Sequence, residues 1–203
     1  MRFLLKFLLL SLLPVYAVAQ SFPALYDVSK LSAGEKLNIR EKPGISSAII
    51  GSFDSGSQDI EVIALNEDGD WGRINHQQRS GWVAMQYLAR QSNQPDNALT
   101  RPLACFGTKP SWSLDVGVGP SVSFLNPGDE PITYDNIKLV ESTNRIDRYA
   151  IFAQSESYLL TSVFHHAACS DGISGSIYGI GVDIFLTTKE DVRFISGCCS
   201  LVR

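Results

Sequence analysis

Short runs of alternating apolar and polar residues, separated by turn residues, fill the first part of the chain. They lie at 37–40, 48–53, 60–65, 72–74 and 82–84. Alternation with a period of two predicts half-buried β-strands, and turns such as Pro43-Gly44 and Asp68-Gly69-Asp70 supply the backbone angles needed between them. No stretch of helical period competes. We therefore expect a small all-β barrel or sandwich over residues 22–89.

A second set of such runs fills residues 99–203. Its candidate strands lie at 114–116, 121–125, 132–134, 137–140, 149–153, 158–164, 180–186 and 192–195. About eight strands favour a closed antiparallel barrel, because closure removes the unpaired edges that an open sheet must protect. Residues 90–98 are polar, contain Pro95 and lack apolar periodicity, which marks a linker. The chain is thus predicted to hold two β domains.

The start of the chain has the pattern of a secretory signal peptide. Residues 1–19 combine two basic residues, an apolar core over 7–13 and a small-residue exit, with cleavage expected between Ala19 and Gln20. The apolar core is too short for a lasting membrane anchor, and no later stretch approaches the length of a membrane span. We expect a periplasmic or secreted protein without stable membrane insertion after cleavage.

The charge balance argues against a nucleic-acid partner. The 203 residues carry 17 basic and 21 acidic side chains, a formal charge of −4, and loss of Arg2 and Lys6 with the signal peptide makes it −6. Proteins that bind polyanions normally carry a basic stripe, and no such cluster occurs. No pattern points to a cofactor either, and the oligomeric state is left open.

All four cysteines, Cys105, Cys169, Cys198 and Cys199, lie beyond the linker. In an exported domain of about a hundred residues they favour two disulfides, for which three connectivities exist. Neighbouring residues of a strand point to opposite faces, so Cys198 and Cys199 need different partners. If the last strand closes the barrel against the first, we expect the pairs Cys105–Cys199 and Cys169–Cys198.

The adjacent His165 and His166 raise two alternatives. Adjacent residues of a strand face opposite ways, so at most one of these histidines can join a cysteine cluster, and an oxidising compartment favours disulfides over zinc. A thiol-dependent envelope enzyme, built on Cys169 and a histidine, requires a free reactive cysteine. Our main prediction has neither a metal site nor a catalytic residue, and the thiol enzyme is kept as an alternative.

Four residues of the first domain, Arg40, Trp71, Arg73 and Tyr87, are candidate ligand contacts. Flat aromatic rings offer contact area to an extended peptide at low entropy cost, and the two arginines can bind a carboxylate through two parallel hydrogen bonds. The competing interpretation is structural. Aromatic residues dominate small cores, so we expect Trp82 and Tyr87 to serve mainly in packing.

A Gly- and Ser-rich turn follows Cys169, and Asp171, Gly172 and Ser174 are its candidate functional residues. These residue types can form a backbone nest that captures a small anion, although a plain turn explains them as well. Presented to an enzyme cleft, the same loop would make the protein an inhibitor of a cell-wall hydrolase. That is the second alternative function.

Five ordered motifs of the first domain are shared with a known family. They are Leu-Asn-Ile-Arg with Pro43-Gly44, Ile-Ile-Gly, Asp-Trp-Gly-Arg-Ile, Ser-Gly-Trp-Val-Ala and Tyr-Leu, at 37–44, 49–51, 70–74, 80–84 and 87–88. In this order they resemble the bacterial SH3-like domain, with departures at Lys42 and at the position after Gly44, which is not aromatic. The resemblance implies a barrel of about five or six strands that tethers exported proteins to cell-wall peptides or partner proteins.

Three blocks of the second domain resemble a family of uncharacterised bacterial envelope proteins. They lie at 105–114, 169–174 and 197–199, with Tyr178 after the second. The family has Gly-Thr-Glu-Pro-Phe-Trp-Ser-Leu, Cys-x-Asp-Gly-Met-Ser and Gly-Cys in these places, and Lys109, Ser111 and Ile173 depart from it. The resemblance implies an envelope location and no known activity. Together these observations predict a non-enzymatic envelope protein whose SH3-like module binds cell-wall peptide or an envelope protein.

Overall fold

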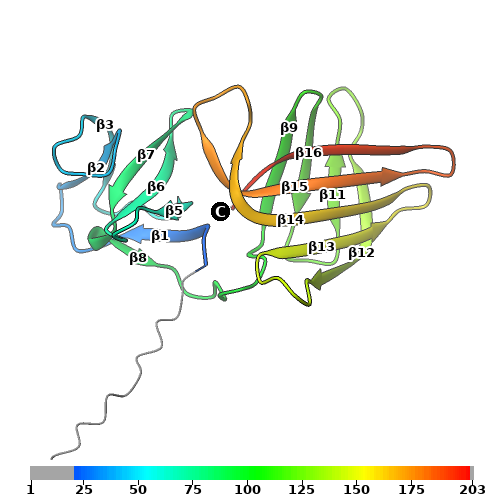
Figure 1. Ribbon diagram of the computed structural model, residues 1–203, viewed down its shortest axis with the longest axis horizontal. Helices are drawn as coiled ribbons and strands as arrows, with labels where there is room; N and C mark the ends of the chain where they lie inside the picture. Colours follow the sequence, from blue (N-terminus) through cyan, green and yellow to red (C-terminus); the bar gives the residue numbers. More distant parts are fainter. Residues whose placement is uncertain (1–20, 202–203) are drawn as a thin grey trace, which may run out of the picture.

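The computed structural model describes residues 21–201, so the expected signal peptide and its cleavage site lie outside the described residues. These residues form an all-β protein, as predicted, with the three-residue 3-10 helix η1 (Met85–Tyr87) as the single helical element among them. No helix in this part of the chain is long and apolar enough to cross a membrane. Two units lie side by side (Figure 1): an N-terminal unit, β1–β8, and a closed barrel, β9–β16.

The N-terminal unit contains two open sheets. A three-stranded sheet has the order β4-β1-β8 and a five-stranded sheet has the order β3-β2-β7-β6-β5. The strands are β1 Ala24–Val28, β2 Lys36–Arg40, β3 Ile49–Asp54, β4 Ile60–Val62, β5 Ala64–Leu65, β6 Trp71–His76, β7 Arg79–Ala84 and β8 Leu88–Arg90. Both sheets contribute to one core, made mostly of aliphatic side chains with Tyr26 as its single buried aromatic residue. The unit has more strands than the resemblance implied: the run predicted at 60–65 forms two strands, β4 and β5, and β1 and β8 lie outside the predicted runs.

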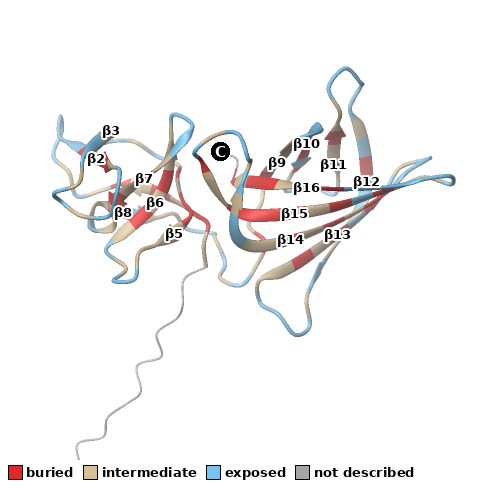
Figure 2. Cartoon of the chain, turned by 45° about the horizontal axis from the view of Figure 1, so that its top comes forward, coloured by how far each residue is buried: buried red, intermediate tan, exposed pale blue. Residues whose placement is uncertain are grey.

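The second unit is a closed antiparallel barrel of eight strands, as predicted. Its strands are β9 Leu103–Thr108, β10 Ser111–Val116, β11 Val122–Leu125, β12 Ile132–Glu141, β13 Arg148–Gln154, β14 Leu159–Ser170, β15 Ile177–Thr187 and β16 Val192–Leu201. Leu114, Phe124, Ile151, Phe164 and Ile184 are among the fully buried residues inside it. Figure 2 shows the buried positions along the strands and the exposed ones at the hairpin ends. The interior is therefore a packed core.

Two errors cancel in the predicted strand count. The strand β9 was not predicted, and the two runs expected at 132–134 and 137–140 form the single strand β12. The pairing of β12 with β13 shifts register between Asp135 and Lys138, and Asn136 has a positive φ of 53°. A bulge of this kind inserts extra residues and interrupts the alternation of side chains, which explains why one strand looked like two.

Two disulfides fix the barrel, and their pairing is the one expected from the sequence: Cys105–Cys199 and Cys169–Cys198. Cys105 in β9 lies directly opposite Cys199 in β16, where the first and last strands of the barrel pair. Cys169 is the last residue but one of β14, and its partner on β16 lies two strands away. One strand, β16, therefore holds a sulfur of each bridge.

The loop between β14 and β15, residues 171–176, leans onto the N-terminal unit (Figure 1). The amide of Gly175 donates to the carbonyl of Gln78 at 2.9 Å, and the carbonyl of Gly175 accepts from the amide of Ser80 at 3.0 Å. Asn75 exchanges two hydrogen bonds with the backbone of Ile177, at 2.9 and 3.1 Å. The hairpin formed by β6 and β7 is thus bonded to the barrel through backbone and side-chain groups.

Residues 90–98, the expected linker, lie against β1. The side chain of Gln94 accepts from the amide of Leu25 at 2.6 Å and donates to the carbonyl of the same residue at 2.8 Å. Asp96 pairs with Arg90 at 3.1 Å and accepts from the amide of Ser21 at 3.0 Å. Polar side chains that indicated a linker in the sequence therefore bind the strand next to them. The division of the chain into domains at this segment stays a prediction.

Candidate functional site

A groove of about 420 Å³ lies on the N-terminal unit between β2, β6 and the segment around η1. It contains three of the four predicted ligand residues, Arg40, Trp71 and Tyr87. The residues that line it are Leu31, Glu35, Lys36, Leu37, Asn38, Arg40, Ile45, Trp71, Ala84, Gln86 and Tyr87. Residues from four separate segments of the sequence therefore converge on one site.

Strand alternation puts the polar and aromatic side chains of the groove on the outer face of the sheet. In β2, Leu37 and Ile39 are buried whereas Asn38 and Arg40 are half-buried, and in β6 Trp71 alternates with the buried Gly72. The apolar side chains of each strand face the core, and the alternate side chains face the groove. The core thus fixes where the groove residues lie.

Arg40 supplies the fixed cationic group of the groove. One Nη of its guanidinium donates to the carbonyl of Ser47 at 2.7 Å, which holds the side chain at the base of the loop after β2. A guanidinium has five N–H donors, so this bond leaves donors for a ligand. Lys36 also lines the groove, but its ammonium pairs with Asp54 at 2.7 Å, and both side chains are exposed.

Trp71 and Tyr87 give the groove its aromatic surface, and both are half-buried. Tyr87 packs partly against the core while still lining the groove, so it combines the two roles weighed from the sequence. Ile45 adds an apolar side chain that is 81% exposed. Sequence reasoning missed Ile45, although it stands directly after Gly44, where the resemblance places an aromatic ligand contact.

Arg73 is not among the residues that line the groove, and its role as a ligand contact stays a prediction. It lies on the same sheet face, but its guanidinium stacks over the ring of Trp82 at 5.1 Å from the ring centroid. Trp82 is half-buried and absent from the core, contrary to the packing role expected for it. The stacked pair arises because Arg73 and Trp82 are direct partners in neighbouring strands.

The candidate loop residues Asp171, Gly172 and Ser174 all make hydrogen bonds within the loop and its flank, and the amide of Gly172 donates to the hydroxyl of Ser170 at 3.2 Å. The carboxylate of Asp171 accepts from the amides of Ile173 and Ser174 at 2.9 and 2.8 Å and from the hydroxyl of Ser174 at 2.6 Å. These bonds, the hydroxyl first, lower the pKa of Asp171. The backbone donors that would form an anion nest thus bind the loop's own carboxylate, and Gly172 supplies a positive φ of 70° for the turn.

This loop is also bonded to the β6–β7 hairpin of the same chain through Gly175. An inhibitor loop must present its backbone and side chains to an enzyme cleft. Here the second half of the loop is used within the molecule, and Ile173, at 66% exposure, is its outermost apolar side chain. The inhibitor alternative gains no support from this arrangement.

Each of the four cysteines takes part in a disulfide, so none is a free thiol of the kind that the thiol-enzyme alternative requires. His166 packs against the ring of Tyr149 at 5.3 Å between centroids, and burial lowers its pKa. Within residues 21–201 no group of three or more His, Cys, Asp or Glu side chains is placed to hold a metal ion.

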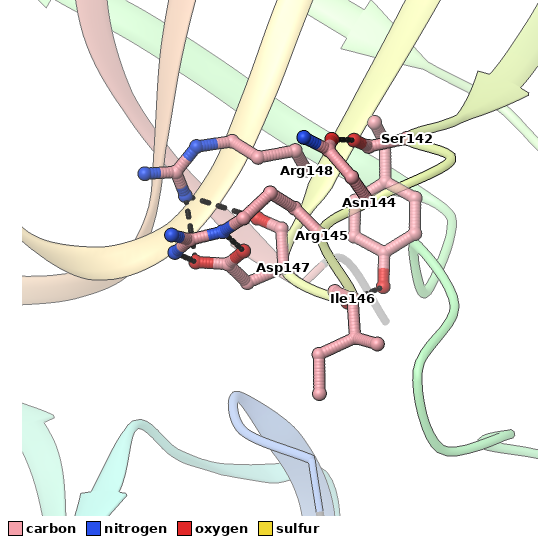
Figure 3. A network of polar contacts seen from close by, with 7 residues as sticks. Ser142, Asn144, Arg145, Ile146, Asp147 and Arg148 are labelled. Atoms are coloured by element: carbon pink, nitrogen blue, oxygen red, sulfur yellow. Dashed lines mark hydrogen bonds and ion pairs between the residues drawn. The ribbon is translucent and has the colours of Figure 1, made fainter.

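The clearest ionic cluster of the barrel lies in the connection between β12 and β13 (Figure 3). Arg145 makes two hydrogen bonds to the carboxylate of Asp147, at 2.9 and 2.8 Å, and Arg148 makes a third at 3.0 Å. Both arginines point at one carboxylate, and they lower the pKa of Asp147 to about 2, with the bond from Arg145 as the largest cause. The cluster keeps one net positive charge, and its three bonds to one carboxylate hold the turn.

Comparison with known proteins bears on the N-terminal unit. No curated protein matches the sequence. The family model ends at residue 89, so the resemblance of residues 99–203 to envelope proteins stays a prediction. Residues 35–89, which include β2 to η1 and all but one of the groove residues, are similar to the family described as Bacterial SH3 domain.

Proposed function

We propose that the chain is a non-enzymatic exported binding protein whose groove on the N-terminal unit takes an extended peptide with a free carboxylate, as found in cell-wall stem peptides. The observation that carries the proposal is the convergence of Arg40, Trp71 and Tyr87 on one groove within residues 35–89. An envelope protein with an extended, carboxylate-bearing segment is the second partner that fits this chemistry.

The groove combines the two features that peptide recognition requires. Trp71, Tyr87 and Ile45 offer apolar area for side chains or for the flat face of peptide bonds, and the guanidinium of Arg40 offers a fork of donors that matches a carboxylate. The contact of Arg40 with Ser47 preorganises the fork, so less rotamer entropy is lost when a ligand binds.

Export is supported by chemistry in two separate parts of the chain. The pattern of residues 1–19 is that of a signal peptide, and the two disulfides of the barrel are of a kind that persists in oxidising compartments. Cell-wall peptide is available in such a compartment. The barrel then serves as a rigid, disulfide-linked body that contacts the binding unit through the β6–β7 hairpin.

The test is a titration of the oxidised protein, residues 20–203, with a synthetic stem peptide, followed by isothermal titration calorimetry. We expect saturable binding that Arg40→Gln weakens about tenfold, because a charge-assisted hydrogen bond contributes roughly 1.5–3 kcal/mol. Trp71→Leu should weaken binding by a similar factor by removing the aromatic surface.

Arg193→Gln is the matched control, since it removes the same charge at the far end of the barrel and should leave the affinity unchanged. Co-sedimentation with purified cell-wall sacculi checks the same variants on the natural polymer. Absence of binding to both peptide and sacculi, or equal loss in Arg40→Gln and Arg193→Gln, would contradict the proposal.

A further inference from the structure

A second cleft lies where the N-terminal unit meets the barrel. Its volume is about 330 Å³, which falls in the range of roughly 300–1,000 Å³ typical of ligand sites, and such sites often lie between domains. Both units contribute to it. The lining residues are Phe53, Ile60, Glu61, Ile74, Asn75, His76, Gln77, Gln78, Ser176, Tyr178 and Ser200.

Most polar groups of this cleft are amides and hydroxyls, and the imidazole of His76 and the carboxylate of Glu61 complete the set. No lysine or arginine is among the lining residues, and the carboxylate of Glu61 accepts a hydrogen bond from the amide of Leu201 at 3.1 Å. Amide side chains both donate and accept, and hydroxyls do the same. The chemistry therefore suits a neutral ligand rich in hydroxyl and amide groups, whereas the peptide groove carries cations for a carboxylate.

Two aromatic rings form the apolar part of the cleft, one from each unit. Phe53 packs edge-on against His76 with 6.2 Å between ring centroids, and Tyr178 packs edge-on against Phe106 at 5.0 Å. These contacts fix the rings while both residues stay half-buried. A fixed ring face is suited to the apolar C–H face of a sugar ring.

The rim of the cleft is a strained turn. Gln77 and Gln78, between β6 and β7, have φ values of 48° and 62°. Such turns favour Asn and Gly because other side chains strain the backbone there. Both glutamine side chains are exposed, and neither makes a hydrogen bond with another described residue. The bonds of Gly175 to the backbone of Gln78 and Ser80 hold the turn, so the barrel loop fixes the backbone that carries the two glutamine side chains at the rim.

We propose that this junction cleft is a second binding site, which takes an uncharged oligosaccharide carrying N-acetyl groups. Gln77 and Gln78 bind the acetamido and hydroxyl groups, and Phe53 and Tyr178 pack against the sugar rings. The site exists only when the two units are docked, because Ser176 and Tyr178 come from the barrel and the other groups named come from the N-terminal unit.

The test uses a β-1,4-linked tetramer of N-acetylglucosamine, which has neither peptide nor charge, and follows the amide resonances of the oxidised protein by NMR. We expect saturable shifts centred on residues 75–78 and 176–178. Gln78→Gly should weaken binding about fivefold by removing one amide contact. The same change relieves the positive φ, so loss of fold cannot explain a loss of binding.

Asn136→Gly is the matched control. It relieves a positive φ of 53° at an exposed residue of the barrel and should leave the affinity for the sugar unchanged. Arg40→Gln, which impairs the peptide groove, should also bind the tetramer normally. Peptide binding and sugar binding are therefore tested independently. The proposal is overturned if the wild-type protein shows no saturable shift, if Gln78→Gly binds as well as the wild type, or if the shifts map to the peptide groove.

Discussion

The two units of this protein are closed in different ways. The barrel completes its ring by pairing β16 with β9, and two disulfides hold that ring. The N-terminal unit consists of two open sheets, and none of the four cysteines lies in it. An aliphatic core and the polar contacts of residues 90–98 hold it together.

The difference separates stability from recognition. A closed ring leaves no free sheet edge, and the barrel interior is filled by its own side chains. The open sheets keep an outer face on which arginine, tyrosine and tryptophan form a groove of about 420 Å³. Covalent stabilisation is thus concentrated in the barrel, and the candidate peptide site lies in the unit that has no disulfide.

The largest expected effect comes from opening the barrel. Replacing Cys105 and Cys199 together by alanine removes a link between residues 94 positions apart, which should lower the free energy of unfolding of the barrel by about 4–5 kcal/mol. Chemical unfolding followed through the buried Trp112 measures this loss. The groove should still bind stem peptide. Loss of peptide binding in a folded double variant would show that the groove depends on the disulfide of the barrel.

The next effect tests how firmly the two units are docked. Asn75→Ala removes two hydrogen bonds to Ile177 and one from Ser80, and should cost about 1–3 kcal/mol. Hydrogen exchange at the amide of Ile177 should accelerate. Asn38→Ala is the control, because its side chain lies on the same sheet face without a hydrogen bond to a described residue. Unchanged exchange at Ile177 would show that the junction does not depend on Asn75.

A smaller, stabilising effect is expected at the strained turn. Gln77→Gly relieves a φ of 48° and should raise the free energy of unfolding of the N-terminal unit by about 1 kcal/mol, the typical cost of a left-handed conformation for an L-residue. Thermal unfolding provides the measurement. A lower melting temperature would mean that the glutamine side chain stabilises the turn by a contact that outweighs the strain.

The smallest effect concerns the ionic turn of the barrel. The pKa of Asp147 is about 2, below its usual value of about 4, because Arg145 and Arg148 bind the ionised form. The stabilisation is therefore present above pH 4 and is lost as the pH falls from about 4 to about 2. An NMR titration of the carboxyl carbon should give the low pKa, and Arg145→Gln should raise it. A pKa near 4 in the wild-type protein would contradict the binding of ionised Asp147 by the two arginines.

The sequence predicts most of this fold because period-two alternation is strong in both units. The prediction fails in two places. The strand β12 looked like two strands because of its bulge near Asn136, and β9, which contains Gly107, was missed. The expected disulfide pairing rested on two premises: Cys198 and Cys199 face opposite sides of a strand, and the last strand of the barrel pairs with the first, as β16 and β9 do.

The candidate site was predicted in part. Arg40, Trp71 and Tyr87 are recognisable by residue type, but the stacking of Arg73 on Trp82 depends on the register between β6 and β7. Ile45 gave little signal because a single exposed isoleucine is common on protein surfaces. The junction cleft was not predicted, since docking of the two units depends on contacts between residues about a hundred positions apart, such as Asn75 and Ile177.

The pairing of β9 with β16 also orders the events of folding. The β6–β7 hairpin closes over a two-residue turn, and local contacts of this kind form fast. The barrel must first bring together segments almost a hundred residues apart, and the loop-closure entropy of that step slows it. The β6–β7 hairpin is therefore expected to form before β9 and β16 close the ring of the barrel.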